Sequence, residues 1–223
     1  PGIVGANVGK NKETERAEND YVVGIERVTP LSDYIVVNIS SPNTEGLRDL
    51  QARESLSQLL GASMEARARV IPDGGKVPPL LVKVAPDLEL AEMQDIADVV
   101  MASEIDGLVI GNTTVDRPTD LRSADKSQAG GLSGRPLMGK STACLAEFYR
   151  LTDGKVPLVG CGGVASGADA YAKIRAGASL VQLYTALVFQ GSALVGRIKR
   201  ELAALLKQDG FANVSEAIAA DHK

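Results

Sequence analysis

Histidine and cysteine are scarce in this chain, and their scarcity excludes several kinds of active site. The 223 residues include one histidine, His222, and two cysteines, Cys144 and Cys161, with no Cys-x-x-Cys spacing. A Ser-His-Asp triad would need its histidine to reach back from the second-last position of the chain. Zinc sites are built mainly from cysteine and histidine at characteristic spacings, so the sequence predicts no metal site.

Basic charge and long apolar runs are also missing. Lysine and arginine number 24 against 28 aspartates and glutamates, which gives a formal net charge of −4. Proteins that bind nucleic acid usually carry a basic excess or stripe, so no nucleic-acid partner is expected. No apolar run reaches the roughly 18 residues of a membrane-spanning helix. The chain starts without a methionine or a signal peptide, and we expect it to be processed or truncated.

The rest of the composition is that of an ordinary globular protein, with 44% hydrophobic and 23% charged residues. Short apolar runs alternate six times with longer segments that have the apolar spacing of a helix. Strands that are apolar throughout are buried on both faces, which predicts a parallel sheet covered by helices. We expect one domain, either a doubly wound sheet or a (β/α)8 barrel with two βα units missing at its N-terminal end. The expected strands are residues 3–8, 34–38, 80–84, 107–110, 156–159 and 180–183.

Polar residues lie at the carboxyl end of every expected strand, which is where barrels build their active sites. They are mostly amides and hydroxyls, with one lysine and no pair of carboxylates. This set suits an oxygen-rich, anionic ligand and disfavours a glycosidase. Its members are Asn7, residues 38–44, Lys83, residues 112–114, Gly162, Gly163, Tyr184 and Thr185.

Lys83 is expected on the same face of its strand as Leu81, because side chains alternate along a strand. An unpaired buried lysine is costly, so Lys83 needs a negative partner. The residues alone leave three alternatives open: a structural ion pair, a Schiff-base nucleophile, and a clamp on a bound anion.

A glycine pair predicts a phosphate site. Gly162 and Gly163 lie between a strand and the helix that starts near Ser166. Backbone N–H groups and the helix N-terminus would surround an anion there. The loops after the last strands of a barrel, here at Tyr184 and Thr185, also commonly hold phosphate.

A long segment without periodicity, residues 112–134, precedes the helix that starts near Leu137. Loops of this length in a compact domain are usually functional or mobile. The segment ends in Gly130-Gly131-Leu132-Ser133-Gly134. This end is either a flexible hinge or a further source of N–H groups, from Ser133 and Gly134, for the same phosphate.

These motifs together resemble dihydroorotate dehydrogenases of class 2, the quinone-reducing flavoenzymes of pyrimidine biosynthesis. The resemblance extends over essentially the whole chain, and as a set the motifs are highly specific. It implies a (β/α)8 TIM barrel with FMN at its carboxyl face, of which residues 1–223 would be the C-terminal six units. The motifs that carry it are residues 37–44 (VNISSPNT), 83–87 (KVAPD), 112–114 (NTT), 130–134 (GGLSG), 162–164 (GGV) and 183–185 (LYT).

The resemblance also implies catalytic roles. Ser41 would be the base that takes the C5 proton of dihydroorotate, while C6 delivers a hydride to N5 of FMN. Thr44 would help to relay that proton to water, and Lys83 would stabilise the reduced flavin. Class 1 enzymes carry cysteine at the Ser41 position, so a serine there favours class 2.

The binding residues are implied by motif in the same way. Two positions depart from the family pattern: Gly111, where threonine is frequent, and Cys161, where valine is familiar. The substrate would be held by Asn38, Asn43, Asn112 and Thr113. The contacts to FMN would come from Asn7, Asn38, Lys83, Gly111, Ser133, Gly134, Gly162, Gly163, Tyr184 and Thr185.

The partners implied by the resemblance are dihydroorotate, orotate and ubiquinone, the last bound through an N-terminal region that this chain lacks. The implied location is the mitochondrial inner membrane, with peripheral association of the full protein. Without the family's first two βα units, the barrel would have an open edge. Two other functions stay open: a Schiff-base aldolase that uses Lys83, and a remnant that keeps the fold without turnover.

Overall fold

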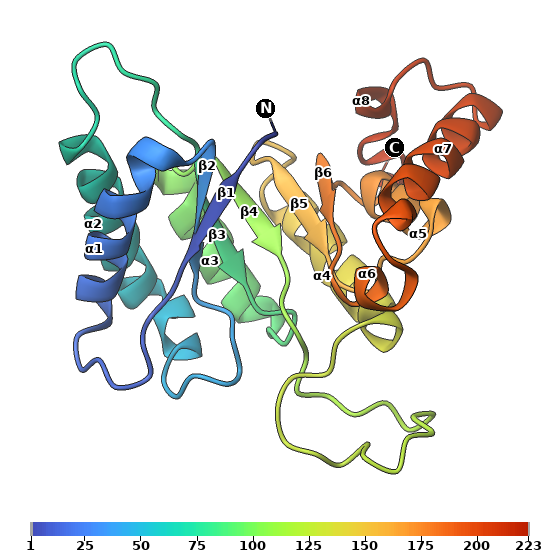
Figure 1. Cartoon of the computed structure of the whole chain (residues 1–223), viewed down its shortest axis with the longest axis horizontal. Helices are drawn as coiled ribbons and strands as arrows, with labels where there is room; N and C mark the ends of the chain where they lie inside the picture. Colours follow the sequence, from blue (N-terminus) through green and yellow to red (C-terminus); the bar gives the residue numbers. More distant parts are fainter. Residues whose placement is uncertain (1, 223) are drawn as a thin grey trace.

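The computed structural model describes residues 2–222, which form one six-stranded parallel sheet with helices between its strands. Each strand pairs with the next one in chain order (Figure 1). A doubly wound sheet would reverse its strand order at one point, so the in-order sheet is the partial barrel that the sequence predicts. The strands are β1 (Gly5–Val8), β2 (Tyr34–Asn38), β3 (Leu80–Val84), β4 (Gly107–Ile110), β5 (Leu158–Cys161) and β6 (Leu180–Gln182).

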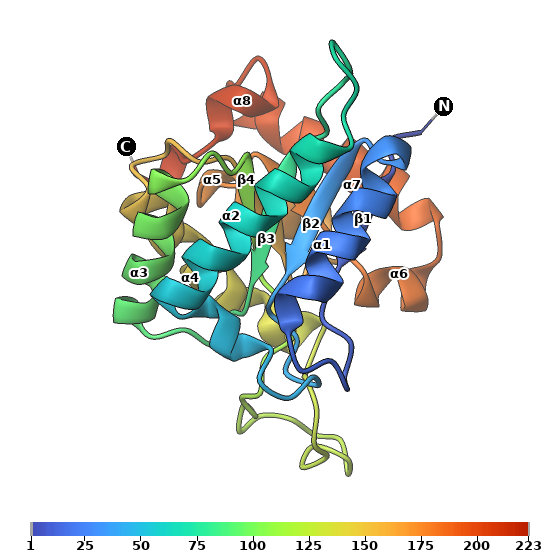
Figure 2. The same cartoon turned by 90° about the vertical axis from the view of Figure 1, so that its left-hand side faces the viewer.

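Helices connect the strands and cover the outer face of the sheet. Figure 2 shows α1, α2 and α3 on the near side of the first three strands. The helices are α1 (Ala17–Val28), α2 (Arg53–Arg69), α3 (Leu90–Ala102), α4 (Met138–Leu151), α5 (Gly167–Arg175), α6 (Thr185–Gln190), α7 (Ala193–Gln208) and α8 (Val214–Ala217).

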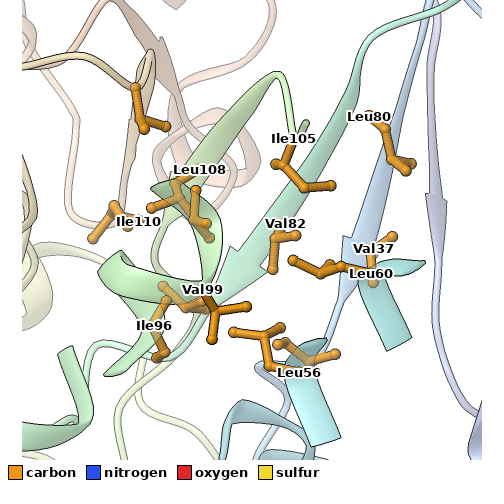
Figure 3. Close-up of a cluster of buried hydrophobic side chains, with 14 of the residues drawn as sticks. Val37, Leu56, Leu60, Leu80, Val82, Ile96, Val99, Ile105, Leu108 and Ile110 are labelled. Carbon is orange, nitrogen blue, oxygen red and sulfur yellow. The ribbon is translucent and has the colours of Figure 1, made fainter. Parts of the chain in front are cut away.

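The main core lies between these helices and the outer face of the sheet. In β3, Leu80, Val82 and Val84 are fully buried and belong to the cluster that includes side chains of α2 and α3 (Figure 3). The alternate residues Leu81 and Lys83 lie on the inner face, so the prediction that they share a face is confirmed. Leu81 packs there in a smaller cluster formed around Val36, Val109 and Val159.

Two predicted strand starts and two predicted strand ends are wrong; β5 ends at Cys161 and β6 at Gln182, against the predicted 159 and 183. The first strand begins at Gly5 rather than at residue 3, and Ile3 is 82% exposed. The fifth strand begins at Leu158 rather than at residue 156. Pro157 has no N–H to donate to a ladder, and its carbonyl accepts the N–H of Leu108 at 3.0 Å.

The sheet does not close on itself within the described residues, because β1 and β6 each pair with a single strand. Apolar side chains are exposed beside this opening, among them Leu180 of β6 and Phe189 of α6, which is 82% exposed. The open edge that six units imply is therefore present. No helix within residues 2–222 is long and apolar enough to cross a membrane.

Candidate active site

A cavity of about 510 Å³ lies at the carboxyl ends of β3 to β6. This volume is typical of sites for small molecules and cofactors. The structure brings together at its wall ten of the residues predicted from the sequence, although they come from four strand ends and the long loop. They are Lys83, Gly111, Asn112, Thr113, Ser133, Gly134, Gly162, Gly163, Tyr184 and Thr185.

The other predicted residues do not line this cavity. Asn38 stands next to Lys83 in the register of β2 and β3. The loop that holds Ser41 lies against the end of the long loop, since a Cβ added at Gly130 would stand 3.5 Å from the Asn43 side-chain oxygen. Asn7 lies further away, exposed on the edge strand β1. The remaining residue, Thr44, belongs to the Ser41 loop.

The glycine pair after β5 has a backbone that other residues rarely adopt. Gly162 and Gly163 have φ values of +104° and +82°. A Cβ added at Gly163 would stand 2.5 Å from the Cα of Met138, at the start of α4. Only glycine therefore fits this turn, and its backbone faces the cavity without side chains in front of it.

The N-terminus of α5 contributes less to this cradle than the sequence predicts. Its N–H groups are already bonded by side chains: Ala165 donates to Asp169, Gly167 donates to Glu201, and Asp169 donates to the cap Ser166. These three N–H groups are therefore engaged within the chain, and the role of the helix N-terminus in holding an anion stays a prediction. The backbone of residues 162–164 remains as the candidate cradle.

The long loop is fixed at its base and reaches the last strand. Thr114 and Leu132 exchange two backbone hydrogen bonds, of 3.0 and 2.7 Å, which close the loop like a short ladder. Figure 1 shows the rest of the loop extending away from the sheet. Beyond the ladder, the Thr185 hydroxyl bonds the Ser133 hydroxyl at 3.0 Å. The two predicted phosphate segments therefore meet.

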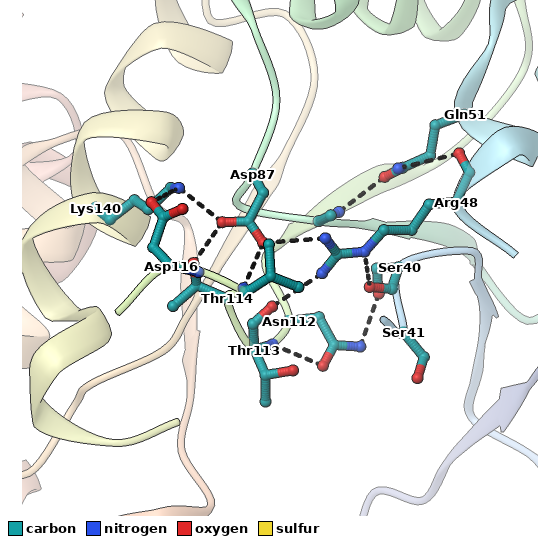
Figure 4. A network of polar contacts seen from close by, with 12 residues as sticks. Ser40, Ser41, Arg48, Gln51, Asp87, Asn112, Thr113, Thr114, Asp116 and Lys140 are labelled. Carbon is teal, nitrogen blue, oxygen red and sulfur yellow. Dashed lines mark hydrogen bonds and ion pairs between the residues drawn. The ribbon is translucent and has the colours of Figure 1, made fainter. Parts of the chain in front are cut away.

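Ser40 joins the amides of the predicted substrate site, and the sequence reasoning did not single it out. Its hydroxyl is fully buried and donates to the Asn38 side-chain oxygen at 2.6 Å. The same hydroxyl accepts from the Asn112 amide nitrogen at 2.9 Å (Figure 4). Because Ser40 also donates its N–H to Asn38, the Asn38 oxygen is occupied and its NH2 group remains available to a ligand.

Arg48 links the loops after β2, β3 and β4 (Figure 4). Its guanidinium donates to the Ser40 carbonyl, to the Asp87 carboxylate and to the Thr113 carbonyl, at 3.1, 3.0 and 3.1 Å. Nothing in the sequence pattern marked Arg48. Asp87 stands in the KVAPD motif, but no role followed from that position.

Asp87 is the centre of this polar network. Its carboxylate also accepts from the Thr114 hydroxyl, the Val115 N–H and the Lys140 ammonium. Burial raises the pKa of Asp87, but these donors, with Lys140 first, outweigh it and hold the pKa below its usual value. The carboxylate therefore stays charged at neutral pH and fixes the loops around the amide cluster.

Two polar groups at the cavity have no bonding partner within residues 2–222. The Thr113 hydroxyl is buried and makes no hydrogen bond. Lys83 lines the cavity, and the described part of the chain gives its ammonium no hydrogen bond or ion pair. A structural ion pair, one of the three alternatives for Lys83, is therefore not formed. Among the described residues there is also no cluster of three or more potential metal ligands.

Replacing Ser40 by alanine should lower the free energy of unfolding by about 1–3 kcal/mol, because two part-buried amides lose their shared partner. Urea denaturation measures this change. Ser63→Ala is the matched control, since the Ser63 hydroxyl is buried without a hydrogen bond. Equal losses in both variants would show that the Ser40 hydroxyl does not hold the amides.

Comparisons with known proteins agree with the geometry. A family model described as dihydroorotate dehydrogenase matches residues 2–206. The chain is 61% identical to "Dihydroorotate dehydrogenase (quinone)" of Azorhizobium caulinodans over 99% of the chain and 62% of the relative. It is 52% identical to the mitochondrial "Dihydroorotate dehydrogenase (quinone)" of Mus musculus over 99% of the chain and 55% of that relative.

A solved structure matches the same way. The crystal structure of DHODH in complex with ferulenol from Eimeria tenella superposes with a TM-score of 0.96 at 43% identity, covering 99% of this chain and 62% of that one. The chain thus spans about 60% of the length of these relatives. Because the family model matches most of the chain and the relatives share its sequence and its partial barrel, the chain belongs to the quinone-type, class 2 dihydroorotate dehydrogenase family.

Proposed function

We propose that the protein oxidises dihydroorotate to orotate in the biosynthesis of UMP, with FMN as cofactor and ubiquinone as the electron acceptor. The observation that carries the proposal is the cavity at the strand ends, whose wall includes nine residues of the motifs that resemble the family's, together with Gly111. We also propose that residues 1–223 are the C-terminal six of the eight βα units of an FMN-binding barrel.

The residues present fit a phosphate-bearing flavin. The backbone of Gly162 and Gly163 offers a cradle free of side chains, and Ser133 and Thr185 border it. Lys83 offers a positive charge without an internal partner among the described residues, on the inner strand face. FMN held there would supply hydride acceptance, and Lys83 would favour the negative charge that develops on its reduction. Further contacts would come from Asn7, Asn38, Gly111, Gly134 and Tyr184.

The amide cluster fits a flat, oxygen-rich substrate. Asn38 presents its NH2 group because Ser40 occupies its oxygen. Asn112 is held by Ser40 and by the Thr113 N–H, and the Thr113 hydroxyl lacks a partner within residues 2–222. With Asn43, these residues would orient the substrate so that its C5 proton lies within reach of Ser41, and Thr44 would pass the proton on to water.

The compartment is a separate question from the reaction. Bacterial and mitochondrial relatives both match, at 61% identity for Azorhizobium caulinodans and 52% for Mus musculus. The comparisons therefore support a quinone-type enzyme without favouring one compartment. The mitochondrial inner membrane and peripheral membrane association remain predictions from the resemblance.

Spectroscopy of the protein, expressed at the full length its gene encodes, tests the proposed function. We expect a yellow protein whose flavin absorbance bleaches when dihydroorotate is added without oxygen and returns when a ubiquinone analogue is added. A colourless protein that forms a borohydride-trapped adduct at Lys83 would support the aldolase alternative instead. Flavin binding without any bleaching would support the remnant.

Replacing Lys83 by alanine should slow flavin reduction by about 10²–10³-fold, because the developing negative charge loses its fixed cation. It should also lower the flavin reduction potential. Lys155→Ala is the control, since Lys155 is exposed and forms a surface ion pair with Asp153. An unchanged rate and potential in the Lys83 variant would remove this residue from the mechanism.

A further inference from the structure

Lys173 of α5 is a buried lysine without a carboxylate partner in the described part of the chain. Its side chain is fully buried, and its ammonium bonds only to the hydroxyls of Ser141 and Thr142 on α4, at 2.8 and 2.9 Å. Two hydroxyls leave the charge of a buried ammonium uncompensated, and an uncompensated buried charge is costly. The buried positive charge of Lys173 therefore calls for a negative partner that the described residues do not supply.

The ammonium lies behind the glycine pair that borders the cavity. The Ser141 hydroxyl that accepts from Lys173 also donates to the Gly162 carbonyl at 3.1 Å. A Cβ added at Gly162 would stand 3.0 Å from the same hydroxyl oxygen. One side chain therefore separates the cation from the cradle, and neither Ser141 nor Lys173 lines the cavity itself.

The strand β5 leaves space for the side chain of Lys173. Gly160 of β5 has no side chain at the place where the stem of Lys173 passes. A Cβ there would stand 2.7 Å from Cδ and 3.2 Å from Cβ of Lys173. The ammonium thus lies on the side of residues 162–163 that faces away from the cavity. The Lys173 side chain reaches it by passing Gly160, a strand position where only glycine leaves room.

We propose that Lys173 is a positioning residue that supplies the buried counter-charge for a phosphate dianion bound on the cavity side of Gly162 and Gly163. It acts through the low-dielectric interior and through Ser141, without touching the ligand. This inference rests on the proposed flavin site. It explains why that site would select an anion. The N-terminus of α5 has fewer N–H groups to offer for that selectivity, because those of Ala165, Gly167 and Asp169 are bonded to the side chains of Asp169, Glu201 and Ser166.

The pKa of Lys173 should change when the phosphate binds. Burial lowers the pKa of Lys173 to about 8, and the groups that oppose this shift are Cys161 of β5, Cys144 of α4 and Asp169 of α5. Burial raises the pKa of Cys144 to about 12, so this thiol stays neutral near pH 8. A bound dianion favours the charged ammonium and raises the pKa of Lys173. Binding then takes up a proton above pH 8, and affinity for the phosphate falls as pH rises through that value.

The test compares FMN with riboflavin, which has the same ring and lacks the phosphate. Both are titrated by fluorescence quenching into the flavin-free protein, expressed at the full length its gene encodes. Lys173→Met should weaken FMN binding at least about tenfold, or about 1.4 kcal/mol, and change riboflavin binding by less than about twofold. Inorganic phosphate, added alone in a thermal-shift assay, should stabilise the wild type and not the variant. Lys155→Met, which removes an exposed lysine, is the charge-matched control.

The wild type alone provides a second measurement, which does not depend on the variant folding. Between about pH 7 and 9.5, the affinity for FMN should fall relative to that for riboflavin, and Cys161→Val should keep this profile. A parallel loss of both flavins in Lys173→Met, or a pH-independent ratio in the wild type, would mean that Lys173 is only structural. If neither flavin binds the wild type, the proposed flavin site itself is wrong.

Discussion

Replacing Ser41 by alanine should slow flavin reduction by dihydroorotate about 10²–10⁴-fold, the usual contribution of general-base assistance. Binding of FMN and orotate should persist, because Ser41 does not line the cavity at the strand ends that we propose for the flavin. The Ser41 hydroxyl accepts the Asn43 N–H at 3.2 Å, and no histidine or carboxylate among the described residues bonds it. A lone serine hydroxyl is a weak base, so we expect its basicity to come from a relay through Thr44 and water.

Single-turnover bleaching of the flavin, followed against pH, measures this effect. The rate should rise with pH in the wild type, because proton removal is the demanding step. Ser41→Cys should retain part of the activity and rise with pH as well, since a thiolate is a stronger base. Ser57→Ala, on the exposed surface of α2, is the control. If Ser41→Ala reduces its flavin at nearly the wild-type rate, the proton acceptor lies elsewhere.

Replacing Gly163 by alanine should yield a protein that has lost its flavin. The backbone there has a φ of +82°, which costs an ordinary residue about 1–2 kcal/mol. In addition, the new Cβ would stand 2.5 Å from the Cα of Met138, so the cradle and the start of α4 must move apart. The ratio of flavin to protein absorbance after purification measures retention, and circular dichroism measures the fold.

Gly210→Ala separates the two causes. Gly210 has nearly the same φ, +81°, but open space where a Cβ would stand. It should therefore lose stability through the backbone alone and keep its flavin. A stoichiometric yellow cofactor in a folded Gly163→Ala protein would contradict the assignment of this turn as the phosphate cradle.

The sequence is sufficient to predict the strand order and much of the cavity wall. Each strand is a short apolar run, and its polar residues stand where parallel strands must end together, so Lys83, Asn112 and Gly163 follow from position alone. The strand ends themselves depend on local details. β5 begins only after Pro157, because proline has no N–H to donate to the ladder. The effect can be predicted only once the neighbouring strand is known.

The polar network behind the site is harder to predict, because its members are far apart in the chain. Arg48 sits in an ordinary-looking polar segment, and only the fold brings it to Asp87 and Thr113. Ser40 and Ser41 are neighbours of the same type in the loop after β2, and only the fold makes one residue buried and the other part-exposed. The bonded N–H group of Gly167 likewise depends on Glu201, which lies 34 residues further along the chain.

The in-order pairing of the strands has a consequence for how the chain acquires its site during synthesis. Each strand needs only the strand just made before it, so the sheet can grow unit by unit as the chain leaves the ribosome. The hydrogen bonds of Arg48 cannot all form in step with the growing sheet, because Thr113 is made 65 residues later. At about 5–20 residues per second, the three loops stay unlinked for about 3–13 seconds. Until Thr113 is made, the loops after β2 and β3 therefore lack this link and stay open to proteases and chaperones.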